Sequence, residues 1–420
     1  MNTVTAYYPQ LSEIEKAYQR LKGVVVNTPL LENHNLSEKL QANIYFKRED
    51  LQVVRSYKIR GAYNKMSSLP KNELQQGIVC ASAGNHAQGV ALSCRKLAVK
   101  GTIFMPATTP NQKVIQVKNF GREYVEVVLE GDTFDEAYDA SKTYCEEKGS
   151  VFIHPFNDEK VIEGQGTVAS EILKDCHFTI DYLFLPIGGG GLAAGVSAVF
   201  KTISPHTKII GVEPAGAPAM KKSLAENVHI TLSQIDKFVD GAAVKRVGDK
   251  TLAICKTNLD AVVTVHEGKI CQTMLELYNR DAIVVEPAGA LSIAVLDQFK
   301  EEIKGKNVVC VVSGSNNDIT RMEEIKERAL LYQGLKHYFV IRFPQRAGAL
   351  KEFVANVLGP QDDIVYFEYS KKTSREKGPA VVGIELKAKD DFKPLMSRMQ
   401  EQGFFGEYLN ERPVLFEFLV

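Results

Sequence analysis

Lys58 lies in an apolar stretch that could support amine chemistry. The segment VVRSYKIRGAYNKM, residues 53–66, places Lys58 between Tyr57 and Ile59 at the expected start of a helix. One interpretation is a solvated helix lysine, with its aliphatic stem packed and its ammonium in water. The other is a desolvated lysine with a lowered pKa, which is neutral often enough to form an imine with a carbonyl compound.

A second candidate segment is SAGNHAQG, residues 82–89, which directly follows an expected strand. It places Ser82 and Asn85 at the entry to a helix, where the first backbone N–H groups have no partner within the helix. Such a site suits a carboxylate or a phosphate. The alternative is an ordinary N-cap, in which Ser82 or Asn85 binds those N–H groups itself.

Two further segments also follow expected strands. PIGGGGLAAG, residues 186–195, contains four consecutive glycines. Glycine lowers stability through backbone entropy and adds no side chain to the packing, so a run of glycines indicates that the backbone itself must be exposed. We expect its N–H groups to form a nest around an anion. A tight turn alone would need one or two glycines. VVSGSNND, residues 311–318, adds the hydroxyls of Ser313 and Ser315, although such residues are common in loops.

The glycine segment also fits a dinucleotide-binding pattern. Gly189, Gly191 and Ala194 match G-x-G-x-x-A after a strand, and Glu213 ends another strand roughly 20 residues later. Alone, this half of the chain could belong to a nicotinamide-dependent oxidoreductase. The extra glycines, the lysine segment and the SAGN segment argue against that interpretation, because a nicotinamide enzyme needs none of them.

The elements that must position these residues alternate along the first three quarters of the chain. Short apolar runs, which we expect to be buried strands, lie at residues 76–84, 99–106, 123–131, 149–156, 181–190, 207–214, 260–265 and 307–315. Amphipathic segments between them, such as residues 85–98 and 132–149, are expected helices. This alternation predicts parallel sheets with helices on both faces, and ligands in such folds bind beyond the carboxyl ends of the strands.

The pattern changes near residue 325. Residues 326–336, KERALLYQGLK, read as a charged helical linker. The following 337–420 give strand, helix, strand, strand, helix and strand, with VLFEFLV as the closing strand. This order predicts a ferredoxin-like module.

Composition excludes several classes of protein. Lys plus Arg and Asp plus Glu both number 51, so no net charge attracts the chain to nucleic acid or anionic membrane. No apolar run reaches the roughly 18–20 residues that span a bilayer. The seven cysteines are scattered and lack C-x-x-C, which favours reduced thiols in a cytoplasm, and no H-E-x-x-H indicates a metal site.

Taken in order, the motifs resemble those of the serine/threonine dehydratases. They are S-Y-K-I-R-G-A, S-A-G-N-H-A-Q-G, G-Q-G-T, G-G-G-G-L-A-A-G, D-G-A-A-V-K-R-V-G, E-P-A-G-A and S-G-S-N. The resemblance implies the tryptophan-synthase-β-like fold of pyridoxal-phosphate enzymes, with two open α/β subdomains, over residues 1–325. The greatest likeness is to the biosynthetic threonine dehydratases (threonine ammonia-lyases), which convert L-threonine to 2-oxobutanoate and ammonia in isoleucine biosynthesis. L-serine dehydratase and serine racemase, of the same fold, are the alternatives.

The resemblance also implies roles for individual residues. Lys58 corresponds to the catalytic lysine that holds the cofactor. The other implied cofactor ligands are Phe46, stacked on the ring, Asn85, the phosphate-binding Gly188, Gly189, Gly190, Gly191 and Leu192, and Ser313, with Ser315 as a possible second hydroxyl. Ser82, Ala83, Asn85 and His86 are expected around the substrate carboxylate.

Departures from the family pattern refine these expectations. Serine racemases carry a serine at the position of Ala83, so alanine disfavours racemisation. The family's divalent-cation site uses an aspartate where this chain has Ala219, so we predict no dedicated metal site. Tyr57 stands where phenylalanine is usual, which we expect to affect packing only.

The C-terminal module resembles the ACT-like regulatory domain of the same family. Its most recognisable piece is P-Q-R-A-G-A-L, residues 344–350, so the expected regulatory residues are Arg346, Gly348, Ala349 and Leu350. The resemblance implies isoleucine as effector, opposed by valine. Such modules commonly pair with a copy of themselves, so we expect a homotetramer or dimer. A module that only mediates assembly is the alternative.

Overall fold

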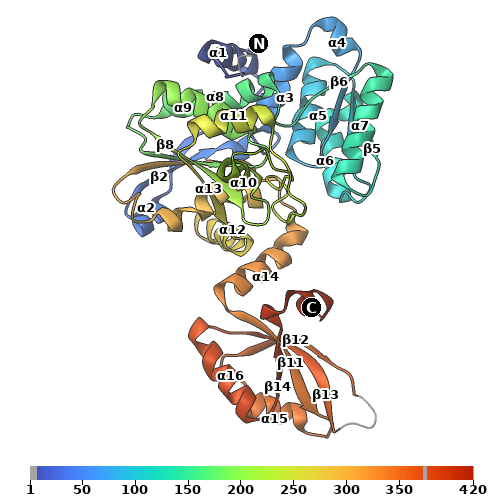
Figure 1. Cartoon of the computed structure of the whole chain (residues 1–420), viewed down its shortest axis with the longest axis vertical. Coiled ribbons are helices and arrows are strands. Elements are labelled where there is room, and N and C mark those ends of the chain that lie inside the picture. The colour runs from blue at the N-terminus through green and yellow to red at the C-terminus, as the bar shows by residue number, and fades with distance from the viewer. Residues whose placement is uncertain (1–6, 372–375, 420) are drawn as a thin grey trace. The chain divides into compact units, whose positions relative to one another are not determined.

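The computed structural model describes residues 7–371 and 376–419 and divides into two compact units, residues 1–319 and 320–420 (Figure 1). The first unit contains two separate sheets, and the second contains one. We refer to them as the catalytic unit and the C-terminal unit.

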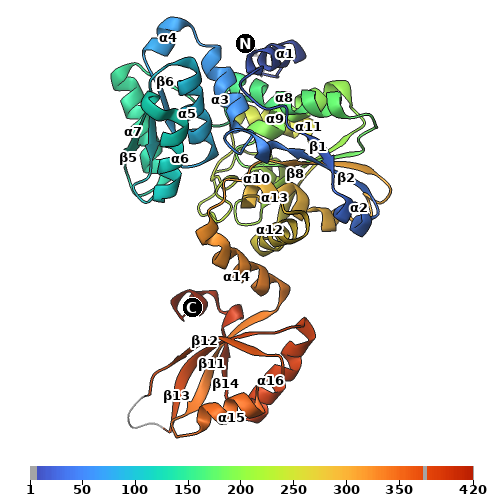
Figure 2. The same cartoon turned by 180° about the vertical axis from the view of Figure 1, so that it is seen from behind.

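The larger sheet of the catalytic unit is parallel except at one edge. Its strands, in spatial order, are β1 (Leu30–Glu32), β2 (Asn43–Arg48), β10 (Asn307–Val312), β7 (Tyr182–Pro186), β8 (Lys208–Pro214) and β9 (Ala261–Val265). Only β1 is antiparallel to its neighbour. Figure 2 shows β1 and β2 beside α2 (His34–Leu40) at this edge.

Helices cover both faces of the larger sheet, as its apolar strands require. Leu183 and Leu185 of β7 belong to a core shared with α8 (Glu159–Asp175), α9 (Gly191–Ile203) and α11 (Asp249–Asn258). The intervening Phe184 points to the opposite face, where it packs on Phe299. That face carries α12 (Glu267–Asp281) and α13 (Pro287–Ala294).

The smaller sheet is entirely parallel. Its spatial order is β5 (Val125–Leu129), β4 (Gly101–Met105), β3 (Ile78–Ala81) and β6 (Val151–Phe152). Ile78 and Cys80 face the core beneath α5 (Asn85–Leu97) and α6 (Asn111–Gly121). Val79 and Ala81 face α7 (Phe134–Lys148). Strand alternation therefore places helices on both faces.

The other elements of the catalytic unit pack around these sheets. They are α1 (Leu11–Leu21), α3 (Lys58–Ser67), α4 (Lys71–Gln75), α10 (Ala219–Glu226) and the 3₁₀ turns η1 (Glu49–Leu51), η2 (Arg122–Tyr124) and η3 (Leu296–Phe299), with η4 (Ile319–Arg321) at the end of the unit. Every segment that the sequence predicts to be a strand of this unit contains one, and the expected parallel α/β class is confirmed. The sequence does not predict β1 and β2.

The C-terminal unit is an antiparallel sheet with two helices between its strands. The chain runs β11 (Lys336–Pro344), α15 (Ala349–Asn356), β12 (Asp363–Tyr369), β13 (Lys377–Glu385), η5 (Lys389–Asp391), α16 (Phe392–Glu401), β14 (Phe405–Tyr408) and η6 (Leu409–Glu411). The strand order β12-β13-β11-β14 gives the ferredoxin-like topology expected. A helix, α17 (Pro413–Leu419), follows η6.

One detail of this unit agrees with the sequence and another differs. Residues 326–333 of the expected helical linker lie in α14 (Met322–Gln333), whose Glu327 Oε1 accepts from Tyr338 Oη of β11 at 2.8 Å. The predicted closing strand VLFEFLV is wrong, because residues 414–419 lie in α17 and the closing strand is β14. Periodicity does not distinguish a short apolar strand from a short apolar helix.

No helix among the described residues is both long enough and apolar enough to cross a membrane.

Candidate active site

The amine of Lys58 lies in a desolvated environment at the first residue of α3. Its Nζ donates to the carbonyl oxygen of Pro155 at 3.1 Å and lies 5.4 Å from the ring centre of Tyr57. Although the residue is partly exposed, burial of its amine lowers the pKa of Lys58 to about 8, against a smaller opposing effect of Glu286. The interpretation as an ordinary solvated lysine therefore fails.

The other candidate segments meet around this lysine. The backbone N–H of Tyr57 donates to the carbonyl oxygen of Ser313 at 3.2 Å. Phe156, which follows the Pro155 partner of Lys58, packs against the glycine segment at Gly189. The parallel strands end at these loops, which is why segments more than 200 positions apart in sequence share one site.

The glycines of residues 188–191 both expose backbone and permit close packing. A Cβ on Gly189 would lie 2.2 Å from the Phe156 ring, and one on Gly190, with φ of +91°, would lie 2.9 Å from Thr251. These glycines therefore serve close packing as well as exposure of the backbone. The turn leads into α9, whose first turn receives no hydrogen bond from the side chain of its N-cap, Gly190. Those N–H groups suit an anion.

The N-terminus of α5 likewise receives no capping hydrogen bond from the side chain of its N-cap residue. Its N-cap is Gly84, so neither Ser82 nor Asn85 forms the ordinary cap considered above. Ser82 Oγ accepts from the Gly84 N–H at 3.2 Å, and the backbone N–H of Ser82 donates to the Phe104 carbonyl oxygen at 3.0 Å. The partly exposed Ala83 lies between them and has no group for proton transfer.

His86, in the first turn of α5, is held as a neutral ring. Its Nε2 lies 2.8 Å from the Ile153 carbonyl oxygen, so Nε2 carries the proton. Burial and the Lys58 charge lower the pKa of His86 to about 3. Its buried Nδ1 has no hydrogen-bond partner among the described residues. The ring thus offers an acceptor, while the backbone N–H is the part of His86 that suits a carboxylate.

Asn85 joins a network that the sequence did not predict. Its Nδ2 donates to Glu286 Oε1 at 2.6 Å, and its Oδ1 accepts from Asn316 Nδ2 at 2.5 Å. Burial raises the pKa of Glu286 to about 7, with a further contribution from Asp240. Glu286 opens the E-P-A-G-A motif, but nothing in the sequence places its carboxyl beside Asn85.

The two serines after β10 have different surroundings. Ser313 is buried, and its hydroxyl donates to the Ala288 carbonyl oxygen at 3.2 Å. The Ser315 hydroxyl donates to the Asp50 carbonyl oxygen at 3.1 Å, on η1. Both serines bind the lysine segment through their backbones, because the Ser313 carbonyl oxygen accepts from the Tyr57 N–H at 3.2 Å and the Ser315 N–H donates to the Arg55 carbonyl oxygen at 2.9 Å.

The aromatic residue expected to stack on the cofactor is Phe46. This residue lies within β2, level with Cys310 of β10, and is only 2 % exposed. The stacking role expected of Phe46 stays a prediction. Tyr57, expected only to pack, is the aromatic residue beside the Lys58 amine.

Glu213 is engaged in the protein's own structure. Its two carboxylate oxygens accept from the backbone N–H groups of Met220 at 2.7 Å and Lys221 at 2.8 Å, at the start of α10. It is therefore not free for a ribose, as the dinucleotide pattern would require. Ala219 begins this helix. Among the described residues, no group of three His, Cys, Asp or Glu side chains could hold a metal ion.

In the C-terminal unit, the expected regulatory residues lie at the turn from β11 to α15. Gly348, with φ of +83°, is the N-cap of α15, followed by buried Ala349 and Leu350, which is 45 % exposed. Arg346 forms an ion pair with Glu352.

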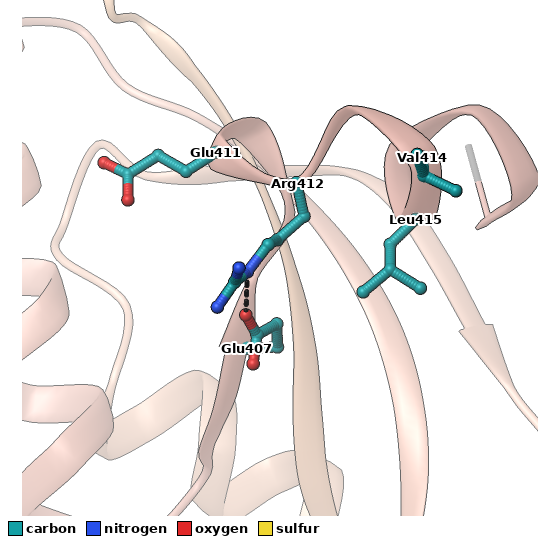
Figure 3. Close-up of a pocket in the computed structure, with 5 residues that line it drawn as sticks. All are labelled: Glu407, Glu411, Arg412, Val414 and Leu415. Carbon is teal, nitrogen blue, oxygen red and sulfur yellow. Dashed lines mark hydrogen bonds and ion pairs between the residues drawn. The ribbon is translucent and has the colours of Figure 1, made fainter.

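A hollow of about 560 Å³ lies at the opposite end of β11, after β14 (Figure 3). Its lining residues are Glu407, Glu411, Arg412, Val414 and Leu415. Arg412 Nε donates to Glu407 Oε1 at 2.7 Å. The hollow is thus separate from the turn that contains Arg346 and Gly348.

Comparison with known proteins identifies the family. Residues 21–314 match the pyridoxal-phosphate dependent enzyme family, and residues 327–419 match the C-terminal regulatory domain of threonine dehydratase. The biosynthetic L-threonine dehydratase of Halalkalibacterium halodurans is 59% identical over 411 residues, which are 98% of this chain and 99% of the relative. This chain belongs to the biosynthetic L-threonine dehydratases. The corresponding dehydratase of Bacillus subtilis is 54% identical over 98% of this chain and 97% of its own length.

Solved structures agree with this placement of the chain among the dehydratases. The processed form of threonine deaminase isoform 2 from Solanum lycopersicum aligns with a TM-score of 0.73 at 41% identity, over 78% of this chain and 92% of that one. Maize serine racemase aligns with a TM-score of 0.71 at 31% identity, over 78% and 99%. The family is that of lyases that use pyridoxal phosphate, so the nicotinamide interpretation is wrong.

Proposed function

We propose that this dehydratase eliminates water from L-threonine, with Lys58 as the residue that holds pyridoxal phosphate and moves the substrate proton. The observation that carries the proposal is a lysine amine with a pKa of about 8 at the point where the SAGN, glycine and SGSN segments meet. An amine that is neutral in a useful fraction of molecules near neutral pH can act as both nucleophile and base.

The residues present fit this cofactor. An aldehyde needs a neutral amine, which Lys58 provides. A phosphate needs N–H donors, which Gly188 to Leu192 provide where the glycine turn enters α9 without a side-chain cap. A phenolic oxygen needs a donor, and Asn85 retains one amide N–H beyond the one given to Glu286. Ser313 supplies a hydroxyl, rather than a carboxylate, for the pyridine nitrogen.

The chain's own residues divide the work of the reaction. Bound pyridoxal phosphate supplies an electron sink that weakens the Cα–H bond of an amino acid. Backbone N–H groups of Asn85 and His86, in the first turn of α5, bind the substrate carboxylate together with Ser82. Lys58 Nζ takes the Cα proton of threonine.

The reaction balances with these groups alone. Loss of the Cα proton and the β-hydroxyl removes one water and gives 2-aminobut-2-enoate. Hydrolysis returns one water and yields 2-oxobutanoate and ammonia. Ala83 lies where a second acid or base would be needed to reprotonate Cα from the other face, so elimination rather than racemisation follows.

Regulation is the function that we propose for the C-terminal unit. The effectors are isoleucine and, in opposition, valine, and the turn at Arg346 and Gly348 to Leu350 binds the amino-acid carboxylate. An uncapped start of α15 and an exposed Leu350 support this proposal. Pairing of this unit with a second copy, in a homotetramer or dimer, places the effector at the interface. The seven free cysteines support a cytoplasmic location.

Steady-state assays of the purified protein test the proposal. Pyridoxal-phosphate-loaded enzyme should be yellow, bleach with borohydride, and release ammonia from L-threonine faster than from L-serine. Lys58→Ala should lose turnover by about 10²–10⁴-fold or more. Lys65→Ala is the matched control, because Lys65 lies on the same helix but pairs with Asp158. Undiminished ammonia release by Lys58→Ala would refute the role given to this lysine.

A further inference from the structure

Glu286 is a buried carboxyl between the two sheets of the catalytic unit. It is the N-cap of α13, beneath the larger sheet, and is only 4 % exposed. Its Oε1 accepts from Asn85, which begins α5 of the smaller sheet. Gly314 makes room for it, because a Cβ there would lie 2.6 Å from Oε1. Burying a carboxyl group is costly, and here a glycine leaves the room that it needs, so we expect Glu286 to have a specific role.

The contacts of Asn85 fix which way its amide faces. When Glu286 is ionised its carboxylate only accepts hydrogen bonds, so Nδ2 rather than Oδ1 faces it. At the other end Oδ1 accepts from Asn316 Nδ2, which also donates to the Val54 carbonyl oxygen at 2.8 Å. Each amide nitrogen has two hydrogens. Asn316 therefore uses both of its own, whereas Asn85 keeps one free.

Glu286 is also the acidic group that acts on Lys58. Its charge opposes the burial that lowers the pKa of Lys58, and it adds to the burial that raises the pKa of Tyr57. Two other charged residues also act on Glu286. Asp240 raises the pKa of Glu286, and Lys113 of α6 lowers it. Asp240 and Lys113 pair with each other at 2.5 Å, so their effects on Glu286 largely oppose one another.

We infer that Glu286 is a positioning residue, which turns the Asn85 amide so that its second N–H meets the phenolic oxygen of the cofactor and which sets the charge beside Lys58. The inference rests on the proposed function, because it needs the cofactor at Lys58. It assigns a role to a residue that touches neither the substrate nor the reacting atoms.

Two substitutions separate the hydrogen bond from the charge. Glu286→Gln keeps an acceptor for Asn85 but removes the charge, so its dissociation constant for pyridoxal phosphate should stay within about threefold of wild type. Glu286→Leu removes the acceptor, and binding should weaken by about tenfold or more, as expected for loss of a charge-assisted hydrogen bond. The readout is a titration of apoenzyme with pyridoxal phosphate, followed by absorbance.

A pH profile measures the charge directly. In apoenzyme, the rate of reductive labelling of Lys58 by pyridoxal phosphate and borohydride should rise with pH as the amine loses its proton. Because the Glu286 anion raises the pKa of Lys58, Glu286→Gln should move this inflection to lower pH. Glu213→Gln is the matched control, since burial also raises the pKa of Glu213 to about 7 but its partners are backbone N–H groups of α10.

The outcomes are distinguishable. The inference is overturned if Glu286→Gln leaves the inflection at the wild-type pH, if folded Glu286→Leu binds the cofactor as tightly as wild type, or if Glu213→Gln reproduces both changes. Should Glu286→Leu fail to fold by circular dichroism, the Glu286→Gln profile decides alone. Failure of wild-type enzyme to take up pyridoxal phosphate at Lys58 would instead refute the proposed function.

Discussion

Arg60 offers a sharp test of how the lysine-bearing helix is held. Two positions after Lys58 on α3, its guanidinium contacts Glu49 at 2.7 Å through Nε and Glu171 at 2.7 Å through Nη1. Lys47 Nζ contacts Glu171 at 2.7 Å. The four side chains are 0 to 2 % exposed and carry two positive and two negative charges. We predict that Arg60→Met destabilises the catalytic unit severely.

The magnitude follows from the charges left behind. Removing Arg60 leaves two buried carboxylates against one ammonium, and breaking a buried pair in this way costs about 3–5 kcal/mol. Burial opposes ionisation of Glu49, but Arg60, with smaller contributions from Lys47 and Thr28, keeps the pKa of Glu49 below its ordinary value. A loss of 1 kcal/mol lowers Tm by about 2–4 °C in a domain of 150–250 residues and by less in a longer one. The Tm of Arg60→Met should therefore fall by about 5–15 °C.

Differential scanning calorimetry of the apoenzyme measures this shift. Arg60→Lys keeps the charge but not the planar fork, so its loss should be smaller than that of Arg60→Met. Lys306→Met is the exposed control, because its pair with Asp181 is 3.8 Å long and its side chain is 49% exposed, and it should change stability by less than about 1 kcal/mol. A Tm of Arg60→Met within 2 °C of the control, about 1 kcal/mol or less, would refute the reasoning.

Three other predictions follow from the site and the units. His86 has a folded pKa of about 3, below the unfolded value of about 6.5, so its contribution to stability is complete above that unfolded value and declines as pH falls. Between about pH 7 and about pH 5, the Tm of His86→Gln should therefore drop less than the Tm of wild type. A chain ending at Ile319 should keep threonine deamination and lose any response to isoleucine in the same assay; a retained response would place the effector site in the catalytic unit. Lys113→Asp or Asp240→Lys alone should raise KM for threonine about two- to fivefold, and the double swap should restore it, because this partly exposed pair joins α6 to the loop beside Glu286.

The sequence was informative where chemistry depends on short segments. The SAGN segment, the glycine segment and the SGSN segment each lie after a strand that the apolar runs predict, and parallel strands bring such loops to one edge. The order of elements in the C-terminal unit was predictable for the same reason. These inferences use neighbouring residues only, so one chain carries all the information they need.

Some errors came from patterns that more than one structure satisfies. VLFEFLV alternates as a strand would, yet the place beside β11 is taken by β14, and residues 414–419 of the segment lie in α17.

What the sequence determined by itself is the set of reactive groups and the strands that present them, because hydrophobic periodicity and glycine content are local properties. What only the tertiary structure decided is which groups become partners. Asn85 and Glu286 are separated by 201 positions, and Arg60 and Glu171 by 111. Hydrogen bonds and buried charges act over a few ångströms, so their partners depend on how the sheets and helices pack rather than on distance along the chain.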